Sequence, residues 1–204
     1  AGETSASIDL DLGYANYDDS PLSFRSNKID QDTQGTFNRL RWNINNTQFF
    51  TETISSVLKF SGQLSDSNLD SSQKFYLGGA TGIRAYPTSE GSGSEGYLLS
   101  AALHKELSAN LTAIGFYDYG FARQYVDNTN NSTGLENATG RNSFNMKGYG
   151  TSIEWTGFVG SYRSTLSAIW SRRIGNNPNP QADGTDSDGT KHSNFYWLKA
   201  SMSF

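Results

Sequence analysis

The residues with the most chemistry to offer stand in one glycine-rich stretch. Residues 74–96 read KFYLGGATGIRAYPTSEGSGSEG, which places Arg84 close to a tyrosine and a proline. A guanidinium is always charged and presents a planar fork of donors that fits a carboxylate. The stretch also contains Phe75, Leu77 and Ile83 and is too apolar for a solvated disordered segment. We therefore expect a long loop that packs inside the protein, with Arg84 at its tip.

The chain offers little for catalysis. His104 and Glu106 are two residues apart on one predicted strand, and with a nearby serine they could perform acyl transfer. An acyl hydrolase is therefore a minor alternative, although a structural role for His104 is preferred. The only other histidine is His192, there is no cysteine, and no serine stands in a G-x-S-x-G elbow. We assign no catalytic residue and expect a protein that is not an enzyme.

Other ligand signatures are weak. Asp183, Asp186 and Asp188 stand among glycines and hydroxyl residues and could gather a calcium ion weakly. Their spacing is not that of an EF-hand, and a flexible surface loop is the preferred interpretation. The sequence contains no dinucleotide or phosphate-binding loop, and its formal net charge of −4 argues against a nucleic-acid partner. No metal and no cofactor are expected.

The elements that must hold the loop show a period of two residues. One face of the segment 97–107 is apolar except for Lys105, whereas the other carries His104 and Glu106. Apolar residues alternate in the same way over 196–204. This is the period of a β-strand. Across the chain it predicts about eight strands, near residues 5–17, 33–45, 50–65, 96–107, 110–123, 143–156, 159–173 and 193–204.

The predicted connections alternate in length. The short ones are 46–49, 108–110 and 156–160, and the long ones are 18–32, 66–95, 124–142 and 174–192. The mean hydropathy is −0.60, and no run of about 18 apolar residues occurs, which excludes a membrane helix. A β-barrel that spans an outer membrane places its apolar residues at alternate positions and alternates short turns with long loops. The sequence therefore predicts an all-β, antiparallel transmembrane β-barrel.

A soluble β-barrel would alternate as well, but with its apolar face inward. Two features favour the membrane barrel. The polar face carries charged residues from many strands, while aromatic residues could face lipid or its headgroup boundary. The other feature is the alternation of long and short connections. The charged set is Arg39, Arg41, Lys59, Glu106, Asp118, Arg163 and Arg173. The aromatic set is Trp42, Tyr119, Tyr149, Trp155, Tyr162 and Trp170. The last strand, which ends in Phe204, resembles the signal by which the bacterial barrel-assembly machinery recognises outer-membrane proteins.

The segment 75–107, FYLGGATGIRAYPTSEGSGSEGYLLSAALHKEL, resembles the corresponding region of the TpsB transporters, the outer-membrane pores of two-partner secretion. In that family, and more loosely in the superfamily that contains the barrel-assembly protein BamA, an L-G-G turn precedes a V-R-G-[FY] tip. The matches are Leu77, Gly78 and Gly79 in the turn and Arg84 and Tyr86 in the tip, with Ile83 in place of valine and Ala85 in place of glycine. The resemblance implies that the loop, about residues 66–95, folds back into the barrel lumen.

A second family motif, F-x-D-x-G on a strand after the loop, is matched by Phe116, Asp118 and Gly120. The resemblance implies that Arg84 pairs with Asp118 inside the lumen and locks the loop there. Either charge alone would lose its hydration in a confined space without a partner, so a bidentate pair suits this role.

The resemblance further implies that residues 1–204 form one outer-membrane β-barrel domain, the C-terminal half of a barrel of roughly sixteen strands that follows periplasmic POTRA domains. The expected function is secretion of a large TpsA-type exoprotein, an adhesin or cytolysin, across the bacterial outer membrane. The expected partners are that exoprotein, outer-membrane lipid and the barrel-assembly machinery. Two alternatives are a self-contained eight-stranded barrel with a structural or adhesive role and a fragment of a BamA-like insertase.

Overall fold

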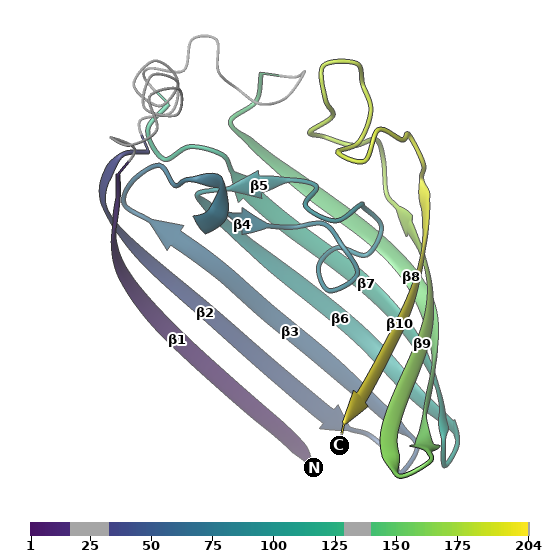
Figure 1. Ribbon diagram of the computed structural model, residues 1–204. Helices are drawn as coiled ribbons and strands as arrows, with labels where there is room; N and C mark the ends of the chain where they lie inside the picture. Colours follow the sequence, from purple (N-terminus) through teal and green to yellow (C-terminus); the bar gives the residue numbers. More distant parts are fainter. Residues whose placement is uncertain (17–32, 129–139, 204) are drawn as a thin grey trace.

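The structure, a computed structural model, describes residues 1–16, 33–128 and 140–203. These residues form one curved antiparallel sheet of eight strands, with a loop folded onto its concave side (Figure 1). The strands are β1 (Gly2–Ala15), β2 (Gly35–Phe49), β3 (Ile54–Ser65), β6 (Glu95–Ser108), β7 (Leu111–Arg123), β8 (Ser143–Val159), β9 (Tyr162–Arg173) and β10 (Asn194–Ser203). The all-β antiparallel fold predicted from the alternation is confirmed.

Between β3 and β6 the chain forms a smaller unit that we call the folded-in loop, residues 66–94. It contains the short 3₁₀ helix η2 (Ser71–Gln73) and a two-stranded ribbon of β4 (Phe75–Tyr76) and β5 (Ser92–Gly93). None of the helical segments among the described residues is long and apolar enough to span a membrane.

Neighbours in the sheet are also neighbours along the chain, in the order β1-β2-β3-β6-β7-β8-β9-β10. β1 and β10 are the two edges, so the sheet is not closed among the described residues. A free edge carries unpaired backbone donors and acceptors, which lipid cannot satisfy. The sheet therefore has the form of part of a barrel wall. The predicted connection 18–32, part of the connection 124–142 and the terminal Phe204 lie outside the described residues.

Two short connections are displaced from the predicted positions. β2 continues through 46–49, and the turn falls at 50–53 instead. Asn46 belongs to a pair of asparagines that is typical of turns, but its side-chain amide donates to the Thr4 hydroxyl on β1 (2.9 Å). This cross-strand bond suits a strand position. β8 also extends further than expected, and its connection to β9 is a tight turn at Gly160, where φ is 63°.

The two faces of the sheet differ in polarity. On the outer face of β1, Ile8 and Leu10 are 75% and 67% exposed. On the concave face, the Asp11 carboxylate accepts from Arg39 (3.1 Å) and Arg41 (2.9 Å) of β2. A soluble barrel would bury the apolar face and expose the charged one. The arrangement is instead that of a barrel with a polar interior and an apolar exterior.

A row of aromatic rings crosses four strands on the outer face. Trp42 lies 5.8 Å from Phe60, Phe60 lies 6.1 Å from Tyr97, and Tyr97 stacks on Phe121 at 5.5 Å between ring centroids. Gly62 is the register partner of Trp42, and a Cβ there would collide with the indole ring. The glycine therefore lets the ring lie on the backbone of the neighbouring strand.

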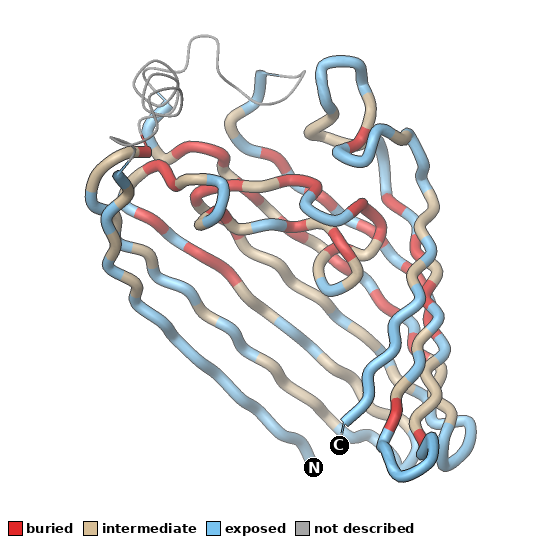
Figure 2. The backbone as a smooth tube through the Cα atoms, viewed as in Figure 1, coloured by how far each residue is buried: buried red, intermediate tan, exposed pale blue. Residues whose placement is uncertain are grey.

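The hydrophobic core lies where the folded-in loop meets the sheet, and there the buried segments of loop and strands gather (Figure 2). It comprises Leu77, Ile83, Ala85 and Tyr86 of the loop, Ala122 of β7, and Phe144 and Met146 of β8. Burial of apolar side chains is the main favourable term in folding. The sheet therefore gains much of its internal packing from the loop that it encloses.

Candidate functional site

The L-G-G turn makes the folded-in loop double back on itself. Gly78 and Ile83 form an isolated β-bridge, and the Ile83 amide donates to the Leu77 carbonyl (2.7 Å). A Cβ on Gly78 would lie 2.8 Å from the Glu90 Cβ, and Gly79 has a φ of 119°. Side chains are excluded at the first position by space and at the second by backbone conformation. The turn delivers Arg84 to the wall of the sheet.

The Arg84 guanidinium grips the Asp118 carboxylate with two parallel bonds. Nε donates to Oδ2 (2.9 Å) and Nη2 donates to Oδ1 (2.7 Å), and the Arg84 backbone amide adds a third bond to Oδ2 (3.1 Å). Ser100 of β6 donates to Oδ1 (2.8 Å) and accepts from Nη2 (3.1 Å). Asp118 is fully buried, so these partners take the place of the water that would otherwise solvate its carboxylate.

The other two residues of the F-x-D-x-G motif shape the surface on which the tip rests. The Arg84 Cζ lies 3.3 Å from the centroid of the Phe116 ring, an arrangement that attracts a cation to the face of the ring. A Cβ on Gly120 would lie 2.7 Å from Leu77 Cδ2 and 2.9 Å from Ile83 Cδ1. The motif thus supplies an aromatic face, a carboxylate and a gap for two apolar side chains.

The backbone of Arg84 is held by two other strands of the sheet, β9 and β10. Its carbonyl oxygen accepts from the Ser171 hydroxyl of β9 (2.5 Å) and from the Trp197 indole of β10 (2.7 Å). Sequence reasoning missed both residues. A signal was present, because Trp197 alternates onto the polar face, where an indole donor needs an acceptor. Arg84 therefore joins β6, β7, β9 and β10.

Ala85 and Tyr86 complete the buried tip. Ala85 stands where the TpsB pattern has glycine, but it is not among the residues with positive φ, and Gly148 on β8 leaves space for its methyl group. The Tyr86 side chain is fully buried, and its burial raises the pKa of the phenol to about 12. The tip thus packs its apolar residues against the strands, while its one cation, Arg84, pairs with Asp118 of β7.

A polar cavity of about 430 Å³ lies beside the tip, toward the end of the sheet with the short turns. Lys59, His104 and Glu154 line it together with Arg84. Glu106 is not among its lining residues, and among the described residues no hydrogen bond joins His104 to a serine. The set considered for acyl transfer is therefore not assembled here.

The open sheet with an apolar outer face, and the loop seated against its concave face, define the chain as part of a membrane β-barrel. Residues 4–143 match the family model described as haemolysin secretion/activation protein ShlB/FhaC/HecB, and the chain belongs to this family. The resemblance to the TpsB transporters is thereby confirmed. The family is one of secretion and transport proteins and not one of enzymes.

The similar curated proteins are heme/hemopexin transporter proteins HuxB of Haemophilus influenzae. One, from strain Rd, is 27% identical over 181 residues, which cover 87% of this chain and 29% of the relative. Another, from strain 86-028NP, is 28% identical over 144 residues, or 69% of this chain and 24% of the relative. The chain thus spans only about a quarter of the length of these relatives. No solved structure shows a significant match.

Proposed function

We propose that this chain is the C-terminal part of an outer-membrane pore that secretes a large TpsA-type exoprotein by two-partner secretion. Membership of the secretion family supports the proposal, as do the apolar outer face and the charged concave face. The free edges of β1 and β10 would pair with the remaining strands of a barrel of roughly sixteen. The outer face would contact outer-membrane lipid after insertion by the barrel-assembly machinery, and the long connections would face the cell exterior.

In this pore the folded-in loop is a plug whose position is set by Arg84 and Asp118. The observation that carries the proposal is the bidentate bond between a loop guanidinium and a strand carboxylate that is fully buried. Such a pair is strong when both partners are present and leaves a buried unpaired charge when one is removed. It therefore favours two distinct positions of the loop, seated or released, over intermediate ones.

The exoprotein is proposed to be an adhesin or a cytolysin. The name of the relatives, heme/hemopexin transporter protein, supports a second candidate, an exoprotein that takes part in heme acquisition. The charged and polar lining of the cavity beside Arg84 suits an extended polypeptide of either kind, because it offers donors and acceptors along the path.

The test is secretion by full-length protein that carries Arg84→Ala or Asp118→Ala. Each change should lower the amount of exoprotein in the medium by about tenfold or more, while the amount of inserted pore stays unchanged, because the loop loses its fixed position. The control is Arg123→Ala, which removes a rim pair with Glu95 (3.2 Å) that is partly exposed. Normal secretion by both test variants would refute the role of the pair.

A further inference from the structure

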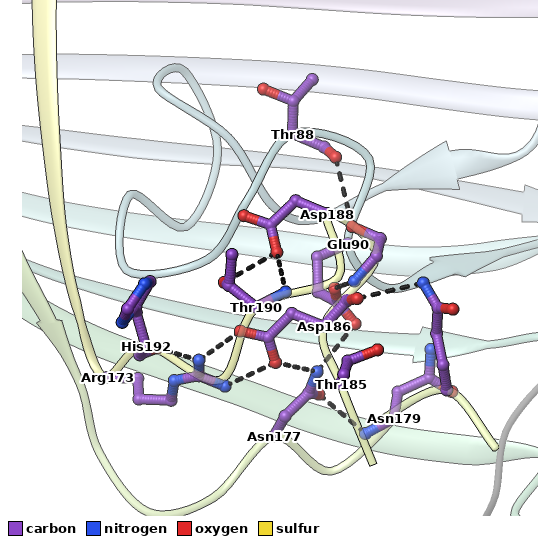
Figure 3. A network of polar contacts seen from close by, with 12 residues as sticks. Thr88, Glu90, Arg173, Asn177, Asn179, Thr185, Asp186, Asp188, Thr190 and His192 are labelled. Carbon is purple, nitrogen blue, oxygen red and sulfur yellow. Dashed lines mark hydrogen bonds and ion pairs between the residues drawn. The ribbon is translucent and has the colours of Figure 1, made fainter. Parts of the chain in front are cut away.

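A second set of polar contacts holds the folded-in loop at the end of the sheet with the long connections (Figure 3). Glu90 belongs to the folded-in loop and is 2% exposed. Its Oε1 accepts from the Asn177 amide (2.8 Å) and its Oε2 from the Ser187 backbone amide (2.6 Å). Both donors come from the connection between β9 and β10, residues 174–193, which we call the outer loop. Both of these hydrogen bonds to the Glu90 carboxylate thus come from a different loop.

The outer loop is itself fixed to the sheet by a buried ion pair. Asp186 is 2% exposed, and both of its carboxylate oxygens accept from the Arg173 guanidinium at the end of β9. Asn177 donates to Asp186 Oδ1 (2.9 Å) as well as to Glu90, so one amide bridges the two carboxylates. Arg173 also lies over the ring of Tyr86 at 5.1 Å. The chain of contacts therefore runs from the sheet through the outer loop to the tip.

These contacts are connected to the Arg84 site through neighbouring positions on β9. Ser171 donates to the Arg84 carbonyl, and Arg173, the next residue on the same face, holds Asp186. Glu90 is also tied to the L-G-G turn, since the Gly78 amide donates to its carbonyl (2.8 Å). The folded-in loop is thus bound to the sheet at Arg84 and to the outer loop at Glu90.

We infer that Glu90, Asn177, Asp186 and Arg173 form a second fastening, the outer clamp, through which the outer loop controls release of the folded-in loop. Rearrangement of the outer loop would withdraw both donors from Glu90 and leave a buried carboxylate unpaired, which favours release. The inference rests on the proposed secretion pore and adds to it a point of control at the exit side. A contact made there by material leaving the pore would act directly on the outer loop.

The first test joins the two loops covalently. The Ser187 hydroxyl lies 3.5 Å from the Thr88 backbone carbonyl oxygen, so the two loops touch there, and the chain has no cysteine. Thr88→Cys and Ser187→Cys in full-length protein without other cysteines can therefore be joined by a short, flexible thiol-reactive cross-linker that a reductant cleaves. Cross-linking should reduce secretion to background, and cleavage of the cross-linker should restore it. Asp183→Cys with Lys191→Cys is the matched control, because these residues touch within the outer loop only. Equal secretion by cross-linked and cleaved Thr88/Ser187 protein would overturn the inference.

The second test needs no cross-linker and no exoprotein. Single-channel recordings of full-length Glu90→Gln should show openings more frequent by on the order of threefold to tenfold, since a charge-assisted bond becomes a neutral one. Asp188→Asn is the control, because Asp188 is exposed and accepts only from Thr190 within its own turn. Equal opening by Glu90→Gln and Asp188→Asn would overturn the clamp and leave the pore intact. A full-length protein that forms no channel would overturn the pore as well.

Discussion

Loss of the Asp118 carboxylate should free the tip of the folded-in loop, and the sequence supplies a reporter for this event. Arg84 is followed by Ala85, so the bond between them is a trypsin site, but its side chain is only 16% exposed while it is bound to Asp118. Cleavage therefore requires the loop to leave its seat. The reporter measures seating of the loop independently of secretion.

The expected size of the effect follows from the contacts. Removing one partner of a buried ion pair costs about 3–5 kcal/mol. In Asp118→Ala, Arg84 keeps the Ser100 hydroxyl and the Phe116 ring and is partly solvated, which reduces the cost to about 2–3 kcal/mol. At about 1.4 kcal/mol per tenfold change, the released population rises by roughly 30-fold to 150-fold. Cleavage should accelerate by the same factor while loop opening is faster than proteolysis.

The assay is a time course of trypsin digestion of folded full-length protein in detergent, with the fragment that ends at Arg84 identified by mass. Glu95→Ala is the control, since it breaks the partly exposed pair with Arg123, and such pairs contribute only about 0–1 kcal/mol. If Asp118→Ala is cleaved at Arg84 no faster than Glu95→Ala, the carboxylate does not hold the loop.

Three further variants test other contacts of the tip. Trp197→Phe removes one of two donors to the Arg84 carbonyl, so trypsin cleavage should rise about twofold to tenfold; an unchanged rate would show that the indole bond is dispensable. Gly120→Ala crowds the loop and should lower the free energy of unfolding by about 1–3 kcal/mol in thermal denaturation, whereas Gly115→Ala, which meets open space, should have no effect. Tyr86 should titrate near pH 12 in the absorbance difference between wild type and Tyr86→Phe. Because burial favours the neutral phenol, the folded-in loop should be held less strongly from about pH 10 upward, where an exposed phenol would already ionise. Titration near pH 10 would mean that the Tyr86 phenol is exposed.

Much of the fold could be predicted because alternation is a local property of the chain. Each expected strand is present, and the faces assigned to Asp118 and Tyr119 follow from counting residues. Turn positions were harder: the turn expected at 46–49 falls at 50–53, and the Asn46 amide is satisfied by Thr4, a residue 42 positions away. Local composition does not reveal partners at that distance.

The site could be predicted only in part from the sequence, for the same reason. Short motifs identified Arg84 and Asp118, and the structure places them together; their role in secretion stays a prediction. Ser171 and Trp197 carry no motif, since a serine and a tryptophan become informative only when strand pairing sets them opposite a carbonyl. Asp186 suggested weak cation binding, whereas its oxygens are taken by Arg173 from the neighbouring strand.

The indole of Trp197 also constrains the order of assembly. It reaches the Arg84 carbonyl from a position 113 residues further along the chain, on β10, which follows the other seven strands of the sheet in the chain. Contacts between such distant positions form late, because closing a long stretch of chain must precede them. The tip therefore acquires its final anchor only when β10 has joined β9, and in refolding experiments protection of Arg84 from trypsin should follow that pairing. Pairing of β10 would then be required before the loop is fully seated, since a sheet that lacks β10 lacks one donor to the Arg84 carbonyl.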